Sequence, residues 1–81
     1  MSEGAWIGVL LTSNNSDDWE LASEILDIYE SDNIVLSDVN TYLNDNSASN
    51  VGVTEDLILI RNMVIDKFDK YYKTSLVPNR I

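Results

Sequence analysis

The chain of 81 residues has no cysteine and no histidine. Without cysteine it has neither disulfide bonds nor thiolate ligands for a metal. Without histidine it lacks the side chain used most often as a metal ligand and as a general base near neutral pH. Its three glycines form no glycine-rich phosphate-binding loop. These absences argue against an enzyme, so we expect no catalytic residues, no cofactor and no metal.

One segment invites comparison with a calcium-binding EF-hand loop, because it lies between two predicted helices. Asp45–Asp56 supplies a carboxylate at each end, but Asn50 stands where the turn requires glycine, and no bidentate glutamate closes the loop. A plain connection between helices is therefore the simpler interpretation.

Long apolar runs are also missing. The longest, Ala5–Leu11, is far shorter than the roughly 20 residues needed to cross a bilayer. Glu3 stands where a signal peptide would carry a positive charge. We therefore expect a soluble, cytoplasmic protein without membrane contact, folded as a single acidic domain over residues 1–81.

Positive charge is absent from the first 60 residues, which contain twelve aspartates and glutamates but no lysine or arginine. All five cations lie in the last 21 residues, beside two aspartates, so the two parts carry −12 and +3 and together give −9. Such a surface repels nucleic acid and anionic lipid, and it attracts basic protein grooves. We therefore expect a basic protein partner and no direct binding of nucleic acid.

Three segments have apolar residues at the helical spacing of three and four. The predicted helices span Thr54–Lys73, Asp17–Glu30 and Asp38–Leu43. Their expected N-caps are Thr54, then Ser16 or Asp17, and Ser37. The residues expected to face the core are Leu57, Ile60, Val64, Phe68 and Tyr71; Leu21, Ala22, Ile25, Leu26, Ile28 and Tyr29; and Val39, Tyr42 and Leu43.

The N-terminal segment from Trp6 to Leu11 fits either a helix or a strand. Gly4, Gly8 and the β-branched residues favour a strand, which would need Asn33–Leu36 or Asn50–Val53 as its partner. We prefer an all-α, single-domain bundle of three to four helices. A small α+β fold with a short N-terminal strand is the alternative.

The second predicted helix carries a stripe of carboxylates. Asp17, Glu20, Glu24 and Asp27 are spaced three, four and three apart, so they share one face over about 15 Å. The candidate partner-binding residues, including neighbours of the stripe, are Asp17, Asp18, Trp19, Glu20, Glu24, Asp27 and Glu30. The stripe is either a nucleic-acid mimic or the solvated side of an amphipathic helix. The absence of interleaved lysine favours the mimic, because ordinary solvated faces mix both signs.

Two further side chains have competing interpretations. Trp19 is either an interface anchor or part of the core of a small protein. Arg61 lies among apolar residues, and we expect it to anchor an acidic residue of the second helix.

The favoured function is therefore that of a small acidic inhibitor, which occupies the basic site of a nucleic-acid-handling protein. Its target would be a nuclease, a DNA-binding protein or a defence complex, as expected of an anti-defence protein from a phage or mobile element. An immunity or antitoxin protein belongs to the same class.

The second half of the chain supports an alternative. The run from Leu36 through Tyr42-Leu43, and then from Asp56-Leu57-Ile58 to Tyr72 and Leu76, resembles the helical core of bacteriophage head–tail connector proteins. This resemblance implies a structural or adaptor subunit. The first three turns of the long helix are apolar nearly all round, which is typical of a helix shared with a second subunit. The alternative is thus an assembly protein that forms a homodimer through the Leu57–Tyr72 helix.

Overall fold

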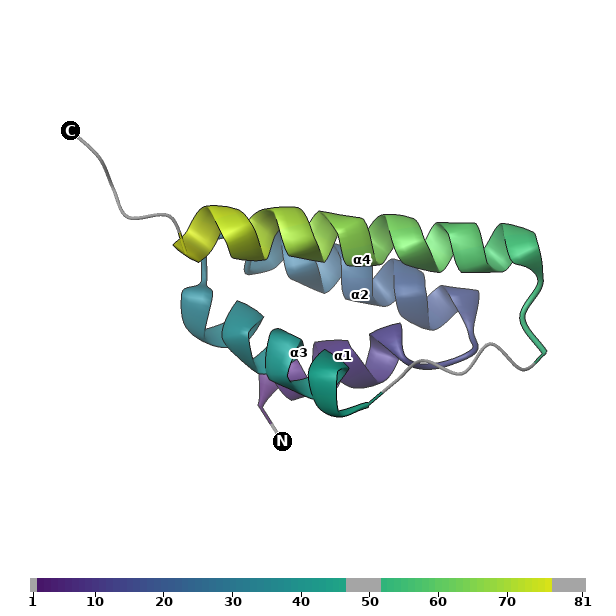
Figure 1. Cartoon of the computed structure of the whole chain (residues 1–81), viewed down its shortest axis with the longest axis horizontal. Helices are drawn as coiled ribbons and strands as arrows, with labels where there is room; N and C mark the ends of the chain where they lie inside the picture. The colour runs from purple at the N-terminus through teal and green to yellow at the C-terminus, as the bar shows by residue number, and fades with distance from the viewer. Residues whose placement is uncertain (1, 47–51, 77–81) are drawn as a thin grey trace.

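A computed structural model describes residues 2–46 and 52–76 of the chain. These residues form four helices and no strand: α1 (Glu3–Leu11), α2 (Ser16–Ile28), α3 (Asn33–Asp45) and α4 (Glu55–Leu76). Successive helices run in alternating directions, and α4 lies alongside α2, with α1 and α3 beneath them (Figure 1). The predicted all-α bundle is confirmed. The N-terminal strand of the alternative is wrong, because the segment forms α1.

The glycines that favoured a strand instead let α1 pack closely on α3. A Cβ atom at Gly4 would fall on the carbonyl oxygen of Val35 and the Cβ of Asp38. At Gly8 a Cβ would lie 2.5 Å from Cδ1 of Tyr42. Glycine costs about 1 kcal/mol relative to alanine inside a helix. Here that cost permits a contact between helices that no larger residue allows.

The third helix is longer than the sequence predicted. It begins at Asn33 rather than Asp38, because the side chain of Asp32 caps it by accepting a hydrogen bond from the Val35 N–H at 3.1 Å. The apolar run that begins at Ile34 is therefore the first turn of a helix. At α4 the predicted cap is confirmed, since the Thr54 hydroxyl accepts from the Leu57 N–H at 3.3 Å.

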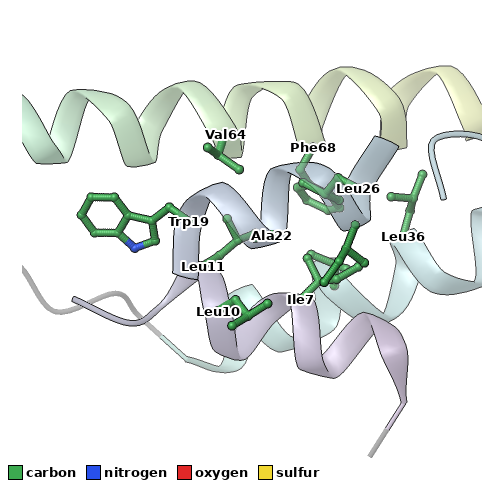
Figure 2. Packing of buried hydrophobic residues seen from close by; sticks show 11 residues of the cluster. Ile7, Leu10, Leu11, Trp19, Ala22, Leu26, Leu36, Val64 and Phe68 are labelled. Carbon is green, nitrogen blue, oxygen red and sulfur yellow. The ribbon is translucent and has the colours of Figure 1, made fainter. Parts of the chain in front are cut away.

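Four helices contribute to one core, and α4 reaches it through Val64 and Phe68 (Figure 2). The buried hydrophobic residues are Ile7, Leu10, Leu11, Trp19, Ala22, Ile25, Leu26, Leu36, Val39, Val64 and Phe68. The prediction that three further residues lie in the core is wrong. Their exposed fractions are 42% at Ile60, 38% at Leu21 and 75% at Ile28. In α4 the inward position next to Ile60 belongs to Arg61, which is 2% exposed.

Some sequence expectations fall partly or wholly on residues that are not described. After the predicted third helix, Asn44 and Asp45 still belong to α3. Residues 47–51 lie outside the described ranges, and they include residues 50 and 51 of the candidate strand. Over residues 2–46 and 52–76, none of the helices combines the length and the apolar character that a bilayer span requires.

Candidate partner-binding surface

The acidic stripe is displayed by α2, whose start is set by a polar cap. The Asn15 side chain accepts a hydrogen bond from the Asp17 N–H at 2.8 Å, so the helix begins at Ser16. The predicted caps, Ser16 and Asp17, therefore lie inside the first turn. Ala22 and Leu26 are fully buried against the rest of the bundle, which turns the opposite side of α2 to solvent.

The side chains of the stripe lie on that solvent side. Those of Asp17, Glu20, Glu24 and Asp27 are exposed, as is Glu30 in the turn that follows α2, whereas Asp18 is half-buried. We call these six residues the acidic surface. At about 1.5 Å per residue, the five on the helix, from Asp17 to Asp27, extend over roughly 15 Å.

Not all of these carboxylates need a functional explanation. Asp17 and Asp18 lie in the first turn of α2, where negative charge is stabilised by the helix dipole. Glu20 and Glu24 lie beyond that turn and gain little from it. Among residues 2–46 and 52–76 the only ion pair joins Lys67 to Asp27. Glu20 and Glu24 therefore face water without a cation from the described part of the chain.

Asp27 has a structural role. Its Oδ1 accepts hydrogen bonds from Lys67 Nζ at 2.9 Å and from the Tyr71 hydroxyl at 2.7 Å, which joins α2 to α4. Lys67 also donates to Ser23 Oγ at 2.7 Å. The hydrogen bonds from Lys67 and Tyr71 lower the pKa of Asp27. The bond to Asp27 raises the pKa of Tyr71 to about 12. Asp27 is thus committed to the fold, and the positive charge of Lys67 offsets its contribution to the acidic surface.

Trp19 does not belong to this surface. Its side chain is fully buried, and its Nε1 donates to the Ser13 carbonyl at 3.0 Å. The expectation that Trp19 contacts a partner is therefore wrong in this conformation, because the indole faces the core.

Arg61 contributes to the burial of Trp19. Its guanidinium carbon lies 4.7 Å from the centroid of the Trp19 ring. Its Nη2 donates to the Ser13 carbonyl and to Asn14 Oδ1, each at 3.3 Å. Burial lowers the pKa of Arg61. Arg61 thus holds the turn before α2 and stacks on Trp19, and the expected anchoring of an acidic residue of α2 is wrong.

Two apolar residues that sequence reasoning placed in the core belong to the solvent side of α2. Leu21 and Ile28 are seven residues apart with Glu24 between them, and both are exposed. Ile28 also lines an open cleft of about 760 Å³ at the turn between α2 and α3, together with Ile34. Helical spacing indicates this exposure, because Leu21 and Ile28 fall on the same helical face as Asp17 and Glu24.

Metal coordination finds no support in the described ranges. Residues 2–46 and 52–76 contain no group of three or more carboxylates that could hold an ion. In the segment compared with an EF-hand, Asp45 belongs to α3, and residues 47–51 lie outside the described residues.

A comparison with protein-family models, with curated proteins and with solved structures finds no match to this chain. A functional proposal for it therefore depends on the geometry and the charge of its own residues. The acidic surface of α2 is the feature that needs an explanation beyond the stability of the fold.

Proposed function

We propose that this protein is a small acidic inhibitor that occupies the nucleic-acid-binding site of a basic partner protein. The observation that carries the proposal is the state of Glu20 and Glu24. Both are exposed beyond the first turn of α2, and neither has a cation partner among residues 2–46 and 52–76. Two such carboxylates are available to the arginines and lysines of another protein.

The spacing of the acidic surface suits that role. Neighbouring carboxylates along α2 lie about 4.5–6 Å apart along the helix axis. A DNA strand carries one phosphate per roughly 3.4 Å, so the two linear charge densities are comparable. A chain of net charge −9 also attracts a basic partner from a distance, which speeds the encounter. In this mechanism Asp17, Glu20 and Glu24 take the places of phosphates.

Apolar contacts would supply the specificity that charge alone does not. Leu21 and Ile28 lie on the same side of α2 as the carboxylates and are exposed. Removal of apolar side chains from water favours the association of two proteins. We therefore expect the partner to contact Leu21 and Ile28 as well as the acidic surface.

The test is a comparison of two double charge reversals. Glu20→Lys/Glu24→Lys changes the acidic surface, whereas Asp45→Lys/Asp69→Lys changes the net charge equally at exposed positions of α3 and α4. Each variant and the wild type are immobilised, and proteins are captured from a nuclease-treated lysate of the host cells. The captured protein is then identified and its affinity for each variant is measured.

We expect the α2 variant to bind the captured protein at least about tenfold more weakly than the control variant. Far-ultraviolet circular dichroism should show that both variants stay folded, because all four side chains are exposed. Equal affinities for the two variants would refute the proposal, since net charge alone would then explain the binding.

A further inference from the structure

The outer side of α4 exposes large apolar residues that the core does not use. The exposed fractions are 61% at Leu59, 42% at Ile60 and 70% at Met63. Met63 follows Leu59 by four residues and Ile60 by three, so its side chain neighbours both of them on the helix surface. Arg61 and Phe68 point the other way, into the bundle. The sequence predicts a homodimer through the Leu57–Tyr72 helix. Within that helix, the face available for such a contact is the one centred on Met63.

The charges on this face are placed symmetrically about Met63. Asp56 precedes Met63 by seven residues and Lys70 follows it by seven, so each lies about 10 Å away along the helix. Both are exposed, and neither forms an ion pair within the described part of the chain. Residues seven apart share nearly the same helical face. The face therefore has an acidic end, an apolar centre and a basic end, and the exposed Asp66 lies between Met63 and Lys70.

We propose that this face pairs with its own copy in a second molecule, as an antiparallel α4–α4 homodimer with the two-fold axis beside Met63. Rotation about that axis brings Asp56 of each copy against Lys70 of the other and buries Leu59, Ile60 and Met63 between them. A parallel arrangement is disfavoured, because it would place Asp56 against Asp56 and Lys70 against Lys70. The face is self-complementary in both charge and polarity, as a two-fold interface requires.

The net charge of the molecule opposes the association of two copies. Each copy carries a net charge of −9, so two copies repel one another at long range. The exposed Lys70 offers positive charge at the place where the copies would meet. The inference is independent of the proposed inhibitor function, because the acidic surface is displayed by α2. A failure of one would leave the other intact.

The absence of native cysteine permits a direct geometric test by cross-linking. Helices packed about 9 Å apart would place the two Met63 Cα atoms within roughly 5 Å of each other, which suits a disulfide. The corresponding Asn62 Cα atoms would be separated by roughly 10 Å, which is too far. Under mild oxidation, Met63→Cys should form a disulfide-linked dimer, whereas the matched exposed variant Asn62→Cys should form no covalent dimer.

Charge exchange tests the register without cysteine. In sedimentation experiments over a range of concentrations, Asp56→Lys should raise the dimer dissociation constant about tenfold, and Asp56→Lys/Lys70→Asp should restore it. Met63→Lys should abolish the dimer while leaving the circular dichroism spectrum unchanged. A wild type that stays monomeric at every concentration, or equal cross-linking of Met63→Cys and Asn62→Cys, would overturn the inference.

Discussion

The close packing of α1 on α3 predicts the sign of the stability change when a glycine of α1 is replaced by alanine. Replacing glycine by alanine inside a helix normally stabilises it by about 1 kcal/mol. At Gly4 and Gly8 we expect the opposite, because the added methyl group would meet α3. At Gly4 it meets the carbonyl oxygen of Val35 and the Cβ of Asp38, neither of which can rotate away.

The magnitude follows from the distances. At Gly8 the new Cβ would lie 2.5 Å from Tyr42 Cδ1 and 2.8 Å from its Cβ, whereas ordinary contacts begin at 3.4 Å. Relieving the clash requires α1 and α3 to separate by roughly 1 Å, and overpacking of this kind typically costs about 1–3 kcal/mol. After subtracting the gain in helix propensity, we expect a net loss of about 1–2 kcal/mol, larger for Gly4→Ala.

Urea unfolding followed by circular dichroism measures this effect. For a domain of this size, with a slope near 1 kcal/mol/M, the midpoint should fall by about 1–2 M with the slope unchanged. The control is Asn62→Ala on the exposed side of α4, which should raise the midpoint slightly. If Gly4→Ala and Gly8→Ala also raised the midpoint, the close contact between α1 and α3 would be absent in solution.

Three further predictions concern the polar contacts that fix α2. Arg61→Lys should reduce the free energy of unfolding by about 1–2 kcal/mol in the same assay, because lysine cannot stack on Trp19 and also bind the turn before α2; an unchanged midpoint would contradict this role. Asp27→Asn should remove stability that the wild type has above the ordinary aspartate pKa of 3.8 and loses as the pH falls through the lowered pKa of Asp27, so the unfolding curves of the two proteins should converge in acid. By NMR titration, Tyr71 should ionise near pH 12 in the wild type and closer to its ordinary value of 10.0 in Asp27→Asn; equal pKa values would show that the Asp27 contact is absent in solution.

Local signals in the sequence predict the helices well but not all of their ends. The long helix follows from Thr54 and a periodic apolar stripe, and α4 begins one residue after that cap. The start of α3 was missed because Asp32 acts as its cap through a side-chain hydrogen bond. A run of β-branched residues after a polar turn has no single local preference, so the tertiary packing decides.

Which face of each helix is buried was less predictable. In α4, hydrophobicity favours burial of Ile60, yet the neighbouring Arg61 is inside, because its guanidinium finds Trp19 and the carbonyl of Ser13. In α2, Ile28 was expected in the core because of its side chain, but it is 75% exposed. Composition alone cannot show that a charged side chain has enough partners to be buried.

The acidic surface was more accessible to sequence reasoning, because a helical spacing of carboxylates determines their common face. Glu20 and Glu24 lie where the spacing placed them. The ion pair of Asp27 with Lys67 depends on the packing of α4 against α2, and no local pattern indicates it. The contribution of each carboxylate to the surface therefore required the fold.

The central claim is that the acidic surface competes with nucleic acid for the same site. The most direct measurement uses the purified partner with labelled duplex DNA bound to it, followed by fluorescence anisotropy during addition of this protein. We predict that the wild type releases the DNA and that Glu20→Lys/Glu24→Lys at the same concentration does not. Formation of a ternary complex, in which the DNA stays bound while this protein also binds, would contradict the account.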